Sequence, residues 1–190
     1  THDQIRRLVA DALAAIGSDE TLVLIDQEGG RVQRLRPPLG RALPPAAAYA
    51  IRYESGDADG ACTAAEAAAR LVAHDLRDLG INTNCTPVLD LPVPGAHAII
   101  GDRAFGTSIE QIVRLGRAVA SGFIAGGVLP LLGRIAQALN DTPGRVLVTG
   151  HTDNQPIRTL RYPSNWHLSQ DRADAVKAEL AKTVKIDRMR

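Results

Sequence analysis

Aromatic residues and unbalanced charge are both scarce in this chain, and each shortage argues against a class of partner. Aromatic residues make up 3% of the 190 residues. A base-stacking surface needs several ring faces, so this composition argues against one. The formal net charge is +1, so no global field draws the chain to nucleic acid or to an anionic membrane. No apolar run approaches the roughly 18 residues of a spanning helix. We therefore expect no nucleic-acid partner and no membrane span.

Cysteine is scarce as well. The two cysteines, Cys62 and Cys85, are too few for a disulfide scaffold. Neither the cysteines nor the histidines His151 and His167 stand at the sequence spacing typical of metal ligands. We therefore expect reduced, structural cysteines, no metal and no cofactor. The first residues, Thr1 to Arg7, are polar and charged, unlike a signal peptide. The sequence as written is therefore expected to be cytoplasmic.

Residues 1–130 alternate between helix patterns and strand patterns. Apolar residues at helical spacing predict helices that begin with pairs at capping spacing and end at glycines. Short apolar runs predict strands over Thr21–Ile25 and Ile81–Leu91, and the proline-rich stretch 31–59 is expected to be irregular. The capping pairs are Thr1 with Gln4, Thr63 with Glu66, and Ser108 with Gln111.

Residues 131–190 show a second pattern. Pro130 suits the first residue of a short helix, and Val146–Thr149 reads as a strand. A long polar loop follows, and Ser169 is expected to cap a last helix. Together the two parts predict an α/β fold, with a small parallel sheet flanked by helices in a three-layer, sandwich-like arrangement. We expect 146–149 to pair beside the strand that begins at Ile81.

Polar residues follow the first predicted strand in the run Asp26-Gln-Glu-Gly-Gly-Arg-Val-Gln-Arg34. A carboxylate at a strand end can accept two sugar hydroxyls, and an arginine fork can bind a carboxylate or an acetamido oxygen. In parallel sheets, the working residues lie in the loops after the strands, here 26–36 and 90–105. The alternative for Asp26 is a plain turn with a helix cap.

This run resembles the N-terminal half of the family 3 glycoside hydrolases, specifically bacterial β-N-acetylhexosaminidases of cell-wall recycling. Two further motifs carry the resemblance, Asn84-Cys-Thr-Pro-Val-Leu-Asp90 and Ile100-Gly-Asp-Arg-Ala-Phe-Gly106, and the likeness covers roughly residues 1–130. It implies that Asp26 would hold the sugar hydroxyls, and that Arg34 and Arg103 would line the sugar subsite.

The family's retaining chemistry requires a nucleophile and an acid/base group about 5 Å apart. By resemblance, the acid/base His should follow Pro130 in a Lys-His-Phe-Pro-Gly-His-Gly loop, and a nucleophilic Asp should come later. The sequence instead reads Leu131-Leu-Gly-Arg-Ile-Ala, so we expect no catalytic residue. Replacement by Glu28, Asp90 or Asp102 is not expected, because catalysis needs separated pKa values and a defined spacing.

A second constellation joins Gly150-His-Thr-Asp153 to Asn165-Trp-His-Leu-Ser-Gln-Asp-Arg-Ala173. Asp153 could bind the amine of a zwitterion, while Arg172 and a helix N-terminus bind its carboxylate. The alternative is a capped helix with a solvated arginine. The pair resembles the peptidoglycan-binding domain of OmpA-like proteins, most closely the type VI secretion variant, over roughly residues 129–182. By resemblance, Asp153 and Arg172 would bind diaminopimelate, and Asn165 and Thr152 would support them. OmpA-like relatives act in the periplasm.

The sequence thus predicts a chimera of two cell-wall protein fragments joined near Pro130. Residues 1–130 would be truncated hydrolase-like βα units, fused to an OmpA-like αβα unit over 131–190, both packed into one shared domain. The expected function is weak peptidoglycan or muropeptide binding without catalysis. A glycosidase relative with residual sugar binding and a recombined fold without evolved function are the alternatives. Open sheet edges also predict self-association.

Overall fold

The structure, a computed structural model, describes residues 1–18, 21–92, 99–131, 163–171 and 173–174. The chain divides into two units, one of residues 1–92 with 100–131 and one of residues 93–99 with 132–190. The packing of both parts into one shared domain stays a prediction.

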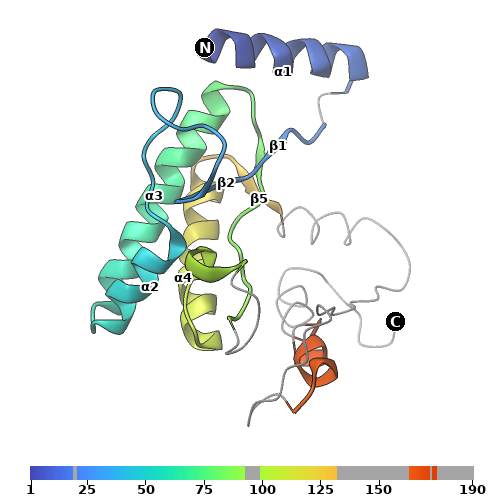
Figure 1. Cartoon of the computed structure of the whole chain (residues 1–190). Helices are drawn as coiled ribbons and strands as arrows, with labels where there is room; N and C mark the ends of the chain where they lie inside the picture. The colour runs from blue at the N-terminus through green and yellow to red at the C-terminus, as the bar shows by residue number, and fades with distance from the viewer. Residues whose placement is uncertain (19–20, 93–98, 132–162, 172, 175–190) are drawn as a thin grey trace. The chain divides into compact units, whose positions relative to one another are not determined.

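The first unit alternates helices and short strands, as Figure 1 shows. Its elements in chain order are α1 (His2–Ile16), β1 (Leu24–Ile25), β2 (Gln27–Gly29), β3 (Val32–Gln33), α2 (Ala46–Glu54), α3 (Ala58–Asp78), β4 (Thr83–Asn84), the 3-10 helix η1 (Gly101–Arg103), α4 (Ile109–Ala125) and β5 (Leu129–Pro130).

The sheet contains three parallel strands in the order β1-β4-β5. Leu24 pairs with Thr83, which in turn pairs with Leu129. Strands β2 and β3 form a separate antiparallel pair. This arrangement confirms the predicted α/β class with a small parallel sheet. Strands β1 and β5 are the edges of this sheet in the described part of the chain, and self-association through them stays a prediction.

Pro130 corrects one expectation. It is the last residue of β5, opposite Asn84, and the first helical residue is Leu131 rather than Pro130. The main-chain N–H of Leu129 donates to the carbonyl of Asn82 at 2.9 Å. Neighbouring N–H groups in a strand point to opposite sides, so the missing N–H of Pro130 costs this ladder nothing.

The expected pairing of residues 146–149 is also wrong at this position. β1 and β5 occupy the two sides of β4, so no free side remains beside Thr83 and Asn84. Residues 146–149 themselves lie outside the described residues.

The predicted helix ends are confirmed for α1 and α4. The Thr1 hydroxyl accepts from the N–H of Gln4 at 3.3 Å, and Gly17 ends α1 with φ 71°. The Ser108 hydroxyl likewise accepts from the N–H of Gln111 at 3.3 Å. Both caps satisfy N–H groups that a helix start leaves without partners.

The start of α3 and the whole of α2 were predicted wrongly. Helix α3 begins at Ala58, where Asp57 accepts from the N–H of Gly60 at 3.0 Å. Thr63 lies inside the helix and donates its hydroxyl to the carbonyl of Asp59. Alanines, which favour helix by propensity without marking an apolar face, start α2 inside the stretch expected to be irregular.

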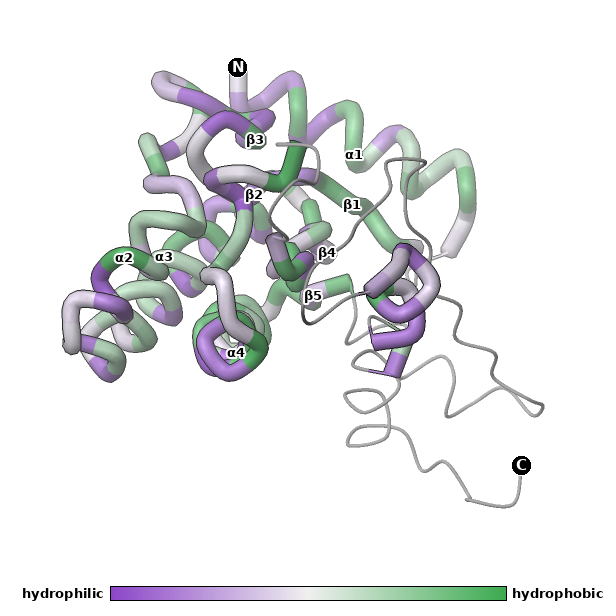
Figure 2. Tube along the Cα trace, turned by 60° about the horizontal axis from the view of Figure 1, so that its bottom comes forward, coloured by the Kyte–Doolittle hydropathy of each residue, from purple (hydrophilic) through white to green (hydrophobic). Residues whose placement is uncertain are grey.

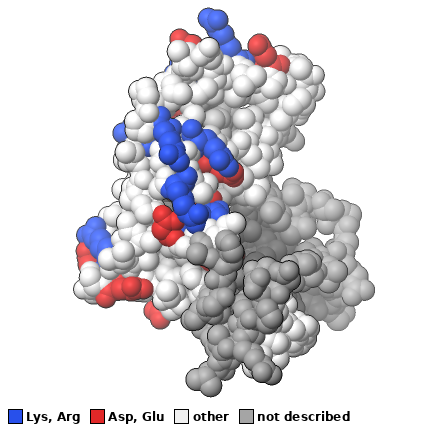
Figure 3. Space-filling view, in the orientation of Figure 1, with Lys and Arg blue, Asp and Glu red and all other residues white. Residues whose placement is uncertain are grey.

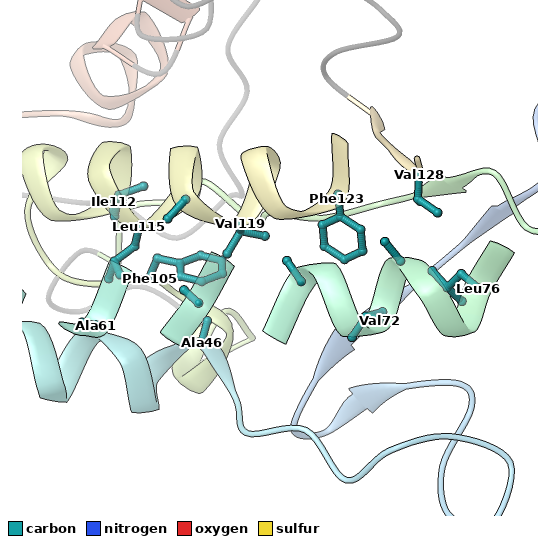
Figure 4. Close-up of a cluster of buried hydrophobic side chains, with 14 of the residues drawn as sticks. Ala46, Ala61, Val72, Leu76, Phe105, Ile112, Leu115, Val119, Phe123 and Val128 are labelled. Carbon is teal, nitrogen blue, oxygen red and sulfur yellow. The ribbon is translucent and has the colours of Figure 1, made fainter. Parts of the chain in front are cut away.

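The hydrophobic core lies between α3 and α4, with contributions from the loop that holds Phe105 (Figure 4). Figure 2 shows α4 nearly end-on, with hydrophobic and hydrophilic residues on different sides of its coil. Small residues bring the two helices together: a Cβ on Gly126 would lie 2.3 Å from the Cβ of Ala73. The core is therefore built from close backbone packing as well as from large side chains.

In the second unit, the described residues form a helix over 165–171 and 173–174. It begins after Ser164, whose carbonyl accepts from the N–H of Leu168 at 3.3 Å. Ser169 therefore does not cap this helix, and its hydroxyl donates to the carbonyl of Trp166 at 2.8 Å. Across all described residues, no helix combines the length and hydropathy that a membrane span requires.

Candidate functional site

Side chains from separate segments meet where the parallel strands end. Asp26 directly follows β1, Cys85 directly follows β4, and Arg103 is the last residue of η1. Glu28 lies in β2, and Arg34 directly follows β3. The structure thus brings Asp26, Arg34 and Arg103 together at the end of the sheet where the parallel strands stop, as the sequence predicted.

Asp26 is a fixed and accessible carboxylate. Its Oδ2 lies 2.7 Å from Nη2 of Arg34, and the two side chains are 42% and 61% exposed, respectively. The hydrogen bond from Arg34 is the main cause that holds the pKa of Asp26 below its usual range, and a hydrogen bond from Cys85 adds to it against the opposing effect of burial. Asp26 is therefore ionised at neutral pH and acts as an acceptor.

Cys85 lies beside this carboxylate as a protonated thiol. Burial raises its pKa, and the negative charge of Asp26 raises it further. Both cysteines are free of disulfides, as predicted. A protonated thiol is a donor, so Cys85 supports the charged form of Asp26.

Arg103 is held by Glu28 in a fork-shaped pair. Nε and Nη2 of Arg103 donate to the two carboxylate oxygens of Glu28 at 2.9 Å and 2.8 Å. The side chains are 23% exposed for Arg103 and 9% for Glu28, the least exposed ion pair in the described part of the chain. The Glu28 carboxylate raises the pKa of Arg103, which is cationic throughout.

A third ion pair fastens the loop of η1 to the loop after β1. Nε of Arg31 lies 2.7 Å from Asp102, and Nη2 of the same side chain donates to the carbonyl of Ile100 at 3.1 Å. Figure 3 shows one face of the molecule, on which basic side chains form a band with acidic ones directly beside it. Glu28 and Asp102, considered as replacement catalysts, are thus both bound to arginines.

Buried amides hold the loop in place. The side chain of Asn84 accepts from the main-chain N–H of Gln27 at 3.0 Å and donates to its carbonyl at 2.9 Å. The Gln27 side chain in turn accepts from the N–H groups of Arg34 and Leu35 and donates to the carbonyl of Leu35. Sequence reasoning missed these supports, although polar residues inside or beside apolar strand patterns were a signal for them.

The second predicted site falls mostly outside the described residues. Thr152, Asp153 and Arg172 lie there, and so does His151. Asn165 is the first residue of the helix over 165–171. The juxtaposition of Asp153 with Arg172 therefore stays a prediction.

Comparison with known families shows which family the part of the chain with the first site belongs to. Residues 2–159 match the family described as "Glycosyl hydrolase family 3 N terminal domain". The chain belongs to this family. The similarity extends to a β-hexosaminidase of Methylococcus capsulatus, 39% identical over 127 residues, which cover 66% of this chain and 35% of that protein.

Solved structures of the family agree with this assignment. NagZ from Neisseria gonorrhoeae in complex with N-trifluoroacetyl-D-glucosamine is 35% identical, with a TM-score of 0.61 over 67% of this chain and 36% of that one. A family 3 β-N-acetylglucosaminidase from Paenibacillus has a TM-score of 0.53 and 36% identity, over 67% of this chain and 23% of that one. This chain spans about a third of the length of the curated β-hexosaminidases that it matches.

A second family match covers the other end of the chain. Residues 130–190 match the OmpA family. The two matches share residues 130–159, so the position of the join near Pro130 stays a prediction. The predicted resemblance to both families is confirmed.

Proposed function

We propose that the family 3 part of this chain binds an N-acetylhexosamine at Asp26, Arg34 and Arg103 without hydrolysing it. The observation that carries the proposal is the ionised Asp26 carboxylate, 42% exposed and held 2.7 Å from Arg34 at the ends of the strands. A fixed carboxylate can accept two neighbouring sugar hydroxyls, while the free donors of Arg103 can meet an acetamido oxygen. The N-trifluoroacetyl-D-glucosamine bound by the Neisseria NagZ supports this ligand class.

The absence of turnover rests on the carboxylates and on the segment after β5. A general acid must keep its proton near neutral pH, whereas Asp26 is ionised and Glu28 and Asp102 are bound to arginines. The sequence that follows β5 is Leu131-Leu-Gly-Arg-Ile-Ala, which lies inside both family matches and differs from the Lys-His-Phe-Pro-Gly-His-Gly loop that the resemblance led us to expect. We therefore propose a chimera joined near Pro130 that binds its ligand weakly and has no glycosidase chemistry.

Titration with N-acetylglucosamine, followed by amide chemical shifts, tests this binding. We expect millimolar affinity, reduced roughly tenfold or more in Asp26→Ala, because a charge-assisted hydrogen bond contributes about 1.5–3 kcal/mol. Asp59→Ala is the matched control, since Asp59 also pairs with an arginine, Arg114, but is 96% exposed. An Asp26→Ala variant that binds as tightly as the wild type would contradict the proposal. So would turnover of a chromogenic N-acetylglucosaminide above buffer that Asp26→Ala abolishes.

A second candidate function is recognition of a peptidoglycan peptide by residues 130–190, favoured by their OmpA family match. Asp153 and Arg172 would bracket the zwitterionic end of diaminopimelate. We expect millimolar binding at best, because ordering the long polar loop offsets part of the contribution of the charged contacts.

Titration with diaminopimelate tests the second candidate. Binding is expected to be lost in Asp153→Ala and in Arg172→Ala alike, and kept in Asp171→Ala, which removes an exposed neighbouring carboxylate. Submicromolar affinity, or binding that survives both substitutions, would rule this site out.

A further inference from the structure

Glu28 occupies one full edge of the Arg103 guanidinium. A guanidinium has five N–H donors, and Glu28 takes one from Nε and one from Nη2. The two donors of Nη1 and one of Nη2 remain, on the end of the fork away from Glu28. Because the pair is bidentate and Glu28 is only 9% exposed, these donors have a fixed direction.

The contact with Glu28 also compensates the positive charge of Arg103. The negative charges of Glu28, Asp90 and Asp26 all act on Arg103. Two neighbouring arginines are paired in the same way, Arg34 with Asp26 and Arg31 with Asp102, while Arg36 donates to the main-chain carbonyls of Gln33 and Arg31. A ligand beside Arg103 therefore meets directed donors whose positive charge Glu28 compensates.

We infer that Glu28 makes this site select uncharged sugars over sugars that carry a carboxylate. The inference rests on the proposed function, that this edge binds a sugar. Without Glu28, Arg103 would be a free cationic fork, the preferred partner of a carboxylate. With Glu28 in place, Arg103 still donates to a hydroxyl or acetamido oxygen, while an added carboxylate is repelled by the acidic side chains around it.

The test compares two sugars that differ in one group: N-acetylglucosamine and its uronic acid, in which a carboxylate replaces the 6-hydroxymethyl group. The wild type is expected to bind the neutral sugar roughly tenfold more tightly. In Glu28→Gln, the affinity ratio is expected to move roughly tenfold or more toward the uronic acid. An unchanged ratio overturns the inference.

Asp59→Asn is the matched control for net charge. It also removes one negative charge beside an arginine, Arg114, but Asp59 lies on α3 rather than at the sugar site and is 96% exposed. We expect the ratio to stay within about twofold of the wild type, because water and salt weaken the effect of a fully exposed charge. A shift equal to that of Glu28→Gln would mean that general electrostatics, rather than the Glu28–Arg103 pair, sets the preference.

The Arg103→Ala background separates positioning from a structural role. If Glu28 acts through Arg103, Glu28→Gln shifts the ratio in the wild type and has no further effect in Arg103→Ala. Equal shifts in both backgrounds overturn the inference. Should Glu28→Gln fail to fold, Arg103→Gln replaces it. This variant leaves Glu28 charged and is expected to weaken binding of the uronic acid relative to the neutral sugar. An unchanged ratio of the two affinities overturns the inference.

The outcomes also separate this inference from the proposed function. If the wild type binds neither sugar, the proposed function is wrong. The inference then stands only if Glu28→Gln gains binding of the uronic acid, and it falls if that variant binds neither sugar.

Discussion

Gly122→Val is expected to lower the free energy of unfolding of the first unit by about 3 kcal/mol or more, because overpacking of a rigid interface is costly. A Cβ at Gly122 would lie 2.2 Å from the carbonyl oxygen of Glu66 and 2.9 Å from the Cβ of Ala69. Both contacts belong to α3, and a helix backbone does not yield as a flexible side chain does. The two helices must therefore move apart.

The wider interface explains why the effect should be large. The buried side chains of α3 are mainly alanines, so its backbone lies close to α4. Separation of the helices would open the core around Phe123 and Val128, which are 2% and 0% exposed. The low aromatic content of the sequence is thus compatible with a packed core, because close backbone approach replaces side-chain bulk.

Ser121→Val is the matched control, since Ser121 is exposed one position earlier in the same helix. It is expected to change stability by about 0.5 kcal/mol. Urea unfolding followed by far-ultraviolet circular dichroism measures both variants. The fluorescence of Trp166 is unsuitable, because this residue lies in the second unit. Equal losses in the two variants would contradict the account of the interface.

The parts of the fold that the sequence predicts are those with a local signal. The caps at Thr1 and Ser108 are set within one turn of the helix, and both occur as expected. The loops at the ends of the parallel strands were predicted from the order of helices and strands, and the place of Arg34 and Arg103 beside Asp26 was predicted from the family resemblance. These predictions required no knowledge of long-range side-chain contacts.

The errors share a different cause. Pro130 ends a strand, and the helix begins one residue later at Leu131, because the N–H of Leu129 donates to the carbonyl of Asn82, 47 positions before Leu129 in the sequence. The fork between Glu28 and Arg103 joins residues 75 positions apart. Such pairings are decided by the tertiary arrangement, which a single sequence does not display.

The paired strands β1 and β4 are only two residues long, and asparagine side chains extend their pairing at both ends. Asn82 accepts from the N–H of Val23 and donates to the carbonyl of Thr21, both at 2.9 Å. Asn84 makes the same two bonds to Gln27, beyond the other end of β1. A side-chain amide thus stands in for a missing main-chain partner on each side.

Asn84→Ala is expected to cost about 2–4 kcal/mol, because it leaves a buried N–H and a buried carbonyl of Gln27 without partners. Asn84 is 0% exposed, so solvent has little access to the groups it leaves. The same change should weaken sugar binding, since Gln27 lies between Asp26 and Glu28 and its side chain positions Arg34.

Asn82→Ala is the control that separates these two effects. It removes the corresponding pair of hydrogen bonds to Val23 and Thr21 and one more from the Thr83 hydroxyl, but all three are part-buried and the pair lies at the opposite end of β1 from Asp26. We expect a smaller loss of about 1 kcal/mol, because water can partly replace the lost partners, and an unchanged affinity for N-acetylglucosamine. Unfolding curves and sugar titrations of both variants provide the comparison. If Asn82→Ala weakens sugar binding as much as Asn84→Ala does, the lost affinity reflects general destabilisation, and Asn84 has no specific part in shaping the site.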